Sequence, residues 1–347
     1  MIPMNTWYVA CTPDEIDGKP LGRQICGHRM VLFRGPEGQV AALDDWCPHR
    51  GAPLSLGRVV DGRLVCGYHG LQMGCEGKTL AMPGQRVRGF LPVRAYPVVE
   101  RHGFVWVWPG DAARADAALI PDLFWAQNPA WAYGGGLYRI GCGHQLMVDN
   151  LMDLTHETFV HGASIGDRAV AEAPFVATHG DRFATVTRWM DDITPPPFWA
   201  GQIRHARGYT GPVDRWQIIR FEAPCTVAID VGVAVAGTGA PQGDRSQGVN
   251  GMVLNTMTPE TDKTCHYFWA FARNYKLSEQ ARTHALREGV SSIFREDEHI
   301  LEAQQKAIDA NPDHVIYNLN IDAGSMWARR LIDRMIAEES AIRLAAE

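Results

Sequence analysis

The chain has 347 residues, a net charge of −6, 46% hydrophobic residues and 21% charged residues. Acidic and basic residues are interspersed, which argues against a basic surface for nucleic acid or membrane lipid. No apolar run approaches the roughly 18 residues of a membrane span, and the first residues lack the basic and apolar regions of a signal peptide. The length is sufficient for two domains.

The N-terminal third of the sequence predicts a small all-β domain. Short apolar runs at 30–33, 40–43, 64–65 and 104–108 alternate with turn segments such as 35–38, and this pattern is typical of strands. Around 109–111 the sequence becomes rich in alanine and able to form helix. We therefore expect one domain over residues 1–112 and a second over residues 113–347.

The second domain is expected to be of the α+β class. Its pattern predicts helices over 146–160, 278–310 and 325–346, and a β-rich region from about 183 to 272. Strands between helices favour an antiparallel sheet packed on helices. The Pro-rich segment 195–197 and the Gly-rich segment 232–251 are expected to form loops near a pocket entrance or an interface.

Two short Cys–His motifs predict a metal centre in the first domain. They are Cys47-Pro-His49 and Cys66-Gly-Tyr-His69. Two thiolates and two imidazoles suit either a structural zinc ion or a Rieske-type [2Fe–2S] cluster. The cluster is favoured because a Rieske centre takes two Cys on one iron and two His on the other, so each loop supplies one of each. Neighbouring glycines also allow backbone amides to approach the sulfur atoms.

A second metal site is predicted around His156 and His161. Five residues correspond to an offset of about 140° on a helix, so His161 must lie at the helix end, where Gly162 fits as a terminator. In the helix 278–310, Asp297 lies within an apolar stripe formed by residues 290, 293, 294, 300 and 301. A buried acid needs a partner or a metal, so Asp297 is the best third ligand. A 2-His-1-carboxylate set leaves positions open at Fe(II). The alternatives are an ordinary histidine pair and an Asp297 that caps the helix or pairs with Arg295.

The two motifs together resemble those of a known family. The sequences CPHRGAPL, CGYHG and LMVDNLMDLTHETFVH are similar to those of the oxygenase component of Rieske non-haem iron oxygenases, and the resemblance extends over the whole chain. It implies a helix-grip (START-like) catalytic domain. Within the family the chain is most similar to O-demethylases of methoxy-substituted aromatic acids, with vanillate as the expected substrate.

The resemblance implies an assembly and further site residues. Relatives form head-to-tail homotrimers, in which the residue matching Asp153 links the mononuclear iron to a Rieske histidine of a neighbouring chain, here His69. Asp153 lies one helical turn before His156 in the predicted helix, which fits a hydrogen bond to an imidazole. Asn150 matches a residue near the iron in relatives; helix packing or capping is the alternative.

The resemblance also implies cofactors and partners. They are one [2Fe–2S] cluster, one mononuclear Fe(II), dioxygen as co-substrate, and a separate reductase with flavin and a plant-type [2Fe–2S] cluster that oxidises NADH or NADPH. The chain itself has no dinucleotide fingerprint, because residues 134–136 lack its spacing. Alternatives are demethylation of veratrate, isovanillate, syringate or 3-O-methylgallate, a ring-hydroxylating dioxygenase, and an electron carrier.

Substrate-binding residues are only weakly indicated by the sequence. A carboxylate substrate requires a cation or several donors, and the β-rich region offers Arg204, His205, Arg215 and Arg220. Tyr138 and Trp199 are candidates for an aromatic wall, with core packing as an equal alternative. The chain has eight scattered cysteines, which we expect to be reduced in the cytoplasm.

Overall fold

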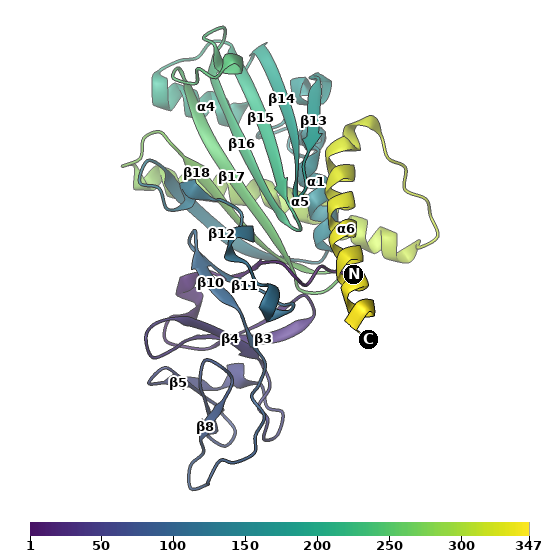
Figure 1. Ribbon diagram of the computed structural model, residues 1–347. Coiled ribbons are helices and arrows are strands. Elements are labelled where there is room, and N and C mark those ends of the chain that lie inside the picture. Colours follow the sequence, from purple (N-terminus) through teal and green to yellow (C-terminus); the bar gives the residue numbers. More distant parts are fainter. Residues whose placement is uncertain (347) are drawn as a thin grey trace. The chain divides into compact units, whose positions relative to one another are not determined.

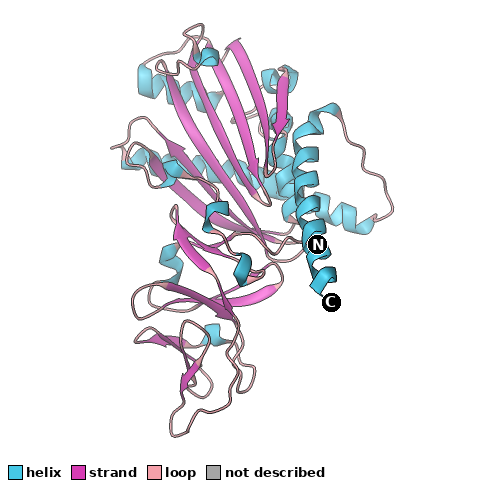
Figure 2. Cartoon of the chain, viewed as in Figure 1, coloured by secondary structure: helices cyan, strands magenta, loops and turns pink. Residues whose placement is uncertain are grey.

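The computed structural model describes residues 1–346 and divides into two compact units (Figures 1 and 2). The first unit comprises Met1–Asp122 and Thr258–Asp262, and the second comprises Leu123–Met257 and Lys263–Glu347. This division falls after Asp122, whereas the sequence-based boundary lies after residue 112 and remains a prediction. Among the described residues, no helix is both long and apolar enough to cross a membrane.

Three antiparallel sheets build the first unit. Their strand orders are β1-β11-β10, β2-β3-β4-β9 and β5-β6-β7-β8. The strands are β1 (Tyr8–Cys11), β2 (Leu21–Ile25), β3 (His28–Arg34), β4 (Val40–Asp44), β5 (Arg58–Val60), β6 (Arg63–Val65), β7 (Gln72–Met73), β8 (Thr79–Ala81), β9 (Ala95–Tyr96), β10 (Val98–Arg101) and β11 (Phe104–Val107). Short 3₁₀ helices are η1 (Pro13–Ile16), η2 (Leu54–Leu56), η3 (Ala112–Arg114) and η4 (Ala117–Leu119).

The predicted all-β character of the N-terminal part is confirmed. Each of the four predicted strand segments falls on a strand, although the last one ends at Val107, one residue early. A short piece of distant sequence completes this unit. The backbone N–H of Cys26 donates to the carbonyl of Pro259 at 2.7 Å, and Thr258 donates to the carbonyl of Val9. No local pattern in the sequence indicates this long-range pairing.

A seven-stranded antiparallel sheet forms the frame of the second unit, in the order β12-β18-β17-β16-β15-β14-β13. The predicted α+β layout is therefore confirmed. The strands are β12 (Ala132–Ile140), β13 (Phe175–His179), β14 (Phe183–Ile193), β15 (Val213–Glu222), β16 (Thr226–Val235), β17 (Gly248–Pro259) and β18 (Cys265–Arg273). The helices are η5 (Phe124–Ala126), α1 (His144–Met152), η6 (Leu154–His156), α2 (Glu157–Val160), α3 (Arg168–Glu172), α4 (Pro197–Arg207), η7 (Ala240–Gln242), α5 (Gln280–Ala310), η8 (Asn320–Asp322) and α6 (Ala323–Ala346).

Helices pack on this sheet at both ends of the strand order. Helix α5 packs on β12 and β18, whereas α6, yellow in Figure 1, packs on β13 and β14, and α1 packs on β15 and β16. The buried residues of α5 repeat at helical spacing, and Asp297 is among them, as predicted; Ile300, expected in the same stripe, is exposed. The predicted helices at 278–310 and 325–346 correspond to α5 and α6.

Three predictions for the second unit are wrong in part. The helix expected over 146–160 is interrupted at Asp153, whose backbone is extended at φ −130° and ψ 102°. The Asp153 carboxylate accepts hydrogen bonds from the backbone N–H and the hydroxyl of Thr155, so it caps a new turn instead of continuing α1. The segment 232–251 forms the expected loop only over residues 236–247, which include η7, because its two ends belong to β16 and β17. Helix α4 occupies part of the region expected to be β-rich.

Candidate metal centres and their pocket

The two Cys–His motifs form matching loops in the first unit. One loop lies between β4 and β5, and the other between β6 and β7. In each loop the cysteine carbonyl accepts a bond from a glycine N–H four residues later, and that glycine has a positive φ. The glycines are Gly51 (φ 71°) and Gly70 (φ 75°). Only a residue without a side chain adopts this backbone readily, which explains the glycine in both motifs.

The side chains of these loops converge. Cys47 and Cys66 are both buried and their thiols contact each other. The rings of His49 and His69 lie 4.6 Å apart between centroids, and Nδ1 of His49 is buried with no hydrogen-bond partner among the described residues. Burial raises the pKa of the Cys47 thiol, and two backbone N–H groups directed at its sulfur oppose that rise. Two thiols, two imidazoles and an unpaired ring nitrogen fit a [2Fe–2S] cluster.

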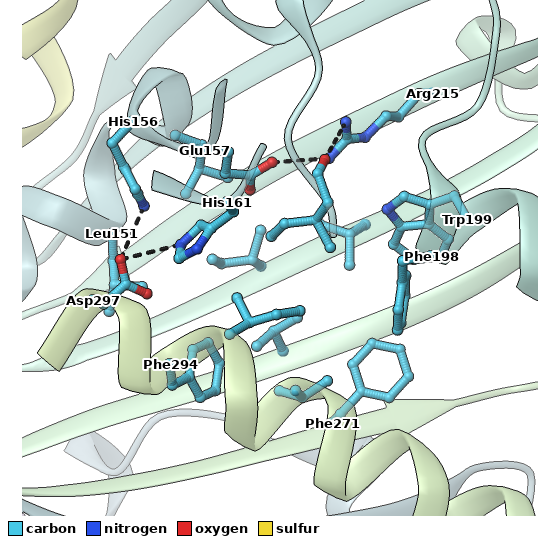
Figure 3. A pocket seen from close by; sticks show the side chains of 17 residues that line it. Leu151, His156, Glu157, His161, Phe198, Trp199, Arg215, Phe271, Phe294 and Asp297 are labelled. Atoms are coloured by element: carbon cyan, nitrogen blue, oxygen red, sulfur yellow. Dashed lines mark hydrogen bonds and ion pairs between the residues drawn. The ribbon is translucent and has the colours of Figure 1, made fainter. Parts of the chain in front are cut away.

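The predicted iron ligands come together in the second unit. His156, His161 and Asp297 each offer a ligand atom within 4.8 Å of the others (Figure 3). Oδ1 of Asp297 lies 3.4 Å from Nε2 of His156 and 3.2 Å from Nε2 of His161. Two imidazoles and one carboxylate facing a common point fit a mononuclear Fe(II) that retains open positions.

His161 lies at the end of a helix, as its spacing from His156 requires. The short helix α2 ends at Val160, so His161 follows it directly. Gly162 does not have the left-handed backbone of a helix-terminating glycine, so the predicted terminator role is wrong. His156 lies in the preceding 3₁₀ turn, and this break in the helix turns both rings toward Asp297.

Hydrogen bonds to the far side of each ring orient the two histidines. Nδ1 of His156 donates to the carbonyl of Asp153 at 2.7 Å, and Nδ1 of His161 donates to Oε2 of Glu296 at 2.7 Å. Both bonds leave Nε2 free to face the common point, which is the usual support of a metal-binding histidine. Asn150 donates to Oδ1 of Asp297 at 3.3 Å, so it contacts the third predicted ligand.

The local electrostatics favour a cation at this point. Burial lowers the pKa of His161, but hydrogen bonds and charge from Asp297 and Glu296 outweigh burial and raise that pKa to about 9. Burial raises the pKa of Asp297, yet the two histidines outweigh it and lower that pKa to about 2. This group of two histidines and two carboxylates therefore stabilises positive charge, which a divalent metal ion supplies.

A largely apolar cavity opens beside the three ligands. Its empty volume is about 630 Å³, including space open to solvent. The apolar walls come from the sheet, from α1, η6, α4 and α5, and from the loop between α2 and α3. They are Leu151, Leu154, Ile165, Phe198, Trp199, Ile229, Val231, Val253, Phe271, Val290, Ile293 and Phe294. Such a cavity suits a small aromatic molecule beside a metal.

A buried ion pair forms the second polar feature of the cavity. Nη2 of Arg215 donates to Oε2 of Glu157 at 2.9 Å, and Gln217 donates to both oxygens of the same carboxylate. Glu157 follows His156 directly, so this pair also anchors the segment that bears the two histidines. Neither Glu157 nor Glu296 was predicted from the sequence to belong to the site. The available signals in the sequence were a carboxylate between the two predicted ligand histidines and a carboxylate directly beside the predicted buried Asp297.

Only some of the substrate-binding residues predicted from the sequence line the cavity. Trp199 and Arg215 line the cavity, whereas Tyr138 contacts Ser291 and does not line it. Arg204 and Arg220 are exposed, and Arg220 pairs with Glu222. His205 is exposed and pairs with Glu279 at 2.8 Å.

Asp153 has a different setting from the one predicted. It does not lie on a continuous helix with His156, because the helix ends there, and it is the backbone carbonyl that accepts from His156. The carboxylate is mostly buried, and its nearest cation is Arg188, with Nη2 at 3.9 Å from Oδ1.

Comparison with known proteins agrees with this geometry. The family model of the Rieske [2Fe–2S] domain matches residues 6–97 of the sequence. The family model of the vanillate O-demethylase oxygenase C-terminal domain matches residues 140–338. The vanillate O-demethylase oxygenase subunit of Pseudomonas sp. (strain HR199 / DSM 7063) is 55% identical over 341 residues, covering 98% of this chain and 96% of the relative. The dicamba O-demethylase oxygenase component of Stenotrophomonas maltophilia is 36% identical, covering 97% and 98%.

Solved structures of dicamba monooxygenase are similar to this chain over almost its whole length. Dicamba monooxygenase bound to 3,6-dichlorosalicylic acid superposes with a TM-score of 0.90 at 35% identity, covering 97% of this chain and 98% of that chain. The structure of that enzyme with non-haem iron and dicamba gives 0.84 at 34% identity, with the same coverage.

The fold and the two centres define the oxygenase component of a Rieske non-haem iron oxygenase. Its cofactors are a [2Fe–2S] cluster and a mononuclear iron. More narrowly, the chain belongs to the vanillate O-demethylase oxygenase family of monooxygenases.

Proposed function

We propose that this chain is the terminal oxygenase of an aromatic O-demethylase and that vanillate is its substrate. The observation that carries the proposal is the set His156, His161 and Asp297 at one side of a largely apolar cavity. The methoxy group of a flat aromatic acid fits beside this set while its ring contacts the apolar walls. Family membership supports the same reaction.

The reaction is a monooxygenation that removes a methyl group. Vanillate, dioxygen, two electrons and two protons yield protocatechuate, formaldehyde and water. When bound, the cluster supplies electrons and the mononuclear iron activates dioxygen. The ligands proposed for the cluster are Cys47, His49, Cys66 and His69, and those for the mononuclear iron are His156, His161 and Asp297.

The residues of the chain orient the metal site and exclude water from it. Glu296 and the carbonyl of Asp153 hold the two imidazoles in one tautomer, with Nε2 directed at the cavity. Asn150 holds Oδ1 of Asp297. Apolar side chains such as Phe294 and Ile293 keep the reacting methoxy group away from bulk water.

Electrons are proposed to enter from a separate reductase and to cross between subunits of a homotrimer. The reductase contains flavin and a plant-type [2Fe–2S] cluster and oxidises NADH or NADPH. The carboxylate of Asp153 would link the iron site of one subunit to His69 of the next. The exposed position of His69 in the isolated chain is compatible with such a contact. The proposed setting is the cytoplasm and the catabolism of aromatic acids released from lignin.

The proposal is tested by assaying formaldehyde release from vanillate, veratrate, isovanillate, syringate and 3-O-methylgallate with a suitable reductase. The highest kcat/KM is expected for vanillate, with one atom of labelled dioxygen in formaldehyde, the other in water, and none of the substrate converted to a cis-diol. Two labelled oxygens on the ring would instead identify a dioxygenase. Absence of any product with a reduced cluster would identify an electron carrier.

A further inference from the structure

The cavity is lined by one buried cation whose hydrogen-bonding capacity is only partly used by the fold. Of the described residues that line it, Arg215 is the sole lysine or arginine. Its side chain is only 2% exposed. We propose that Arg215 binds the carboxylate of the aromatic acid and so selects acids over neutral methoxy-aromatics. This inference rests on the proposed function and specifies how that site recognises its substrate.

The donor count supports a ligand at Arg215. A guanidinium group has five N–H donors. Nη1 of Arg215 donates to the carbonyl of Ile165 at 3.2 Å, and Nη2 donates to Glu157 at 2.9 Å. Nε is buried and has no hydrogen-bond partner among the described residues. A buried donor without an acceptor is unfavourable, so the site is suited to an acceptor that arrives with the substrate.

The position of Arg215 suits a substrate held at two points. In Figure 3 the three metal-binding side chains lie on the left and Arg215 on the upper right, with Phe198, Trp199 and Phe271 on its side of the cavity. An aromatic acid with its methoxy group at the metal side therefore directs its carboxylate toward Arg215. The other walls between these two points are apolar, apart from Glu157.

Arg215 is held rigidly in this position. The carboxylate of Glu157 accepts bonds from both Arg215 and Gln217, and the carbonyl of Ile165 accepts from the other arm of the guanidinium. A guanidinium group fixed in this way loses little freedom when it binds a carboxylate. Two-point binding by a planar group also determines the orientation of the substrate.

A second buried arginine offsets the charge of Glu157. Arg188 lies on β14, opposite Gln217 on β15, and its side chain is 2% exposed. Its nearest carboxylate oxygen, on Asp153, is 3.9 Å from Nη2, and its Nε and Nη1 have no hydrogen-bond partner among the described residues. Two guanidinium groups thus lie near Glu157, so a substrate carboxylate enters a region that is not dominated by negative charge.

An alternative role for Arg215 is purely structural, as a support for Glu157 and for the histidines on either side of it. The two roles predict different results. A support acts on every substrate and on the metal alike, whereas a carboxylate contact acts only on acids. A pair of substrates that differ only in the acid group therefore separates them.

The test compares vanillate with vanillyl alcohol, which retains the methoxy and phenol groups and lacks the carboxylate. The holoenzyme and the double variant Arg215→Gln with Glu157→Gln are assayed for formaldehyde, and anaerobic calorimetry gives the Kd of each compound. The double variant removes both charges together, so it leaves no unpaired buried ion. Loss of the anchoring pair acts on both substrates, whereas loss of a carboxylate contact acts only on the acid, so we expect the ratio of kcat/KM for vanillate to that for vanillyl alcohol to fall at least about tenfold.

Two further variants complete the experiment. Arg215→Lys keeps the positive charge beside Glu157 and should weaken vanillate binding while sparing the alcohol, because an ammonium lacks the planar fork. Arg220→Gln, on the same strand and exposed, is the matched control and should leave the ratio of the two substrates unchanged. Equal losses for acid and alcohol, or an unchanged ratio in both Arg215 variants, would overturn the inference. Absence of formaldehyde from every methoxy compound with wild-type enzyme would instead refute the proposed function.

Discussion

Glu296 and His161 are joined by a hydrogen bond of 2.7 Å between Oε2 and Nδ1, although they lie 135 residues apart. The same imidazole presents Nε2 to Asp297 at 3.2 Å. Glu296 directly precedes Asp297 on α5, so one helix supplies both the proposed metal-binding carboxylate and the group that orients a proposed metal-binding histidine.

Glu296→Gln should weaken binding of the mononuclear metal by about tenfold to a hundredfold, the usual cost of losing a carboxylate behind a metal-binding histidine. The measurement is a titration of the iron-depleted mononuclear site with Fe(II) or Co(II). Glu298→Gln, two residues further along α5, is the control and should bind metal as the wild type does. Equal affinity of the Glu296 variant and the wild type would contradict the role.

His161→Ala should remove the mononuclear iron and retain the two irons of the cluster, because the proposed sites have no ligand in common. Turnover should be lost while the visible spectrum of the cluster stays intact. The measurement is iron and acid-labile sulfide per chain, beside formaldehyde release. Retention of the third iron would show that His161 is not a ligand.

Asp153→Asn should preserve the fold, because asparagine caps a helical turn about as well as aspartate and can still accept from Thr155. Both metal centres should be retained, yet oxidation of the reduced cluster in a single turnover should slow, since the proposed link to His69 of the next subunit loses its charge. The readout is the absorbance of the cluster after mixing with dioxygen and substrate. A wild-type rate would refute the link.

His144 should make the protein sensitive to mild acid. Burial lowers the pKa of His144 to about 4, and its Nε2 has no hydrogen-bond partner among the described residues. The pKa of His144 in the folded protein lies below its unfolded value near 6.5. The contribution of His144 to the free energy of unfolding is therefore fully present above pH 6.5 and is lost as the pH falls toward 4. Between pH 7.5 and 5.5 this loss amounts to about 1 kcal/mol.

The measurement is denaturant unfolding of wild type and His144→Gln at both pH values. The variant should lose less stability than the wild type by about that amount. His314→Gln, at an exposed position, should follow the wild type. A variant that loses as much stability as the wild type between the two pH values would exclude His144 as the cause.

Long helices and motif residues could be predicted from the sequence for local reasons. The apolar stripe of α5 repeats at helical spacing, so both the helix and the buried position of Asp297 followed from periodicity. The break at Asp153 was missed because its neighbours on both sides favour helix. Only the local competition by the Asp153 side chain, which bonds to Thr155, ends α1 there.

The role of Arg215 was beyond prediction for a different reason. Strand β15 is buried on both faces, since Gln217 and Trp216 are both inaccessible to solvent. Alternation along the strand therefore does not show which side faces the cavity. Arg215 and Arg220 were equal candidates in the sequence, and they lie at a buried cavity wall and at an exposed position respectively.

Spacing within short segments was enough to predict the Cys47–His49 and Cys66–His69 loops, the His156–His161 pair and the class of fold. The distant groups that meet these residues became visible only in the folded chain: Glu296 behind His161, and Arg215 and Gln217 around Glu157. Those contacts join strands and helices that are far apart in the chain, and their pairing depends on how the sheet and helices pack. Local patterns in a single sequence carry no record of that packing.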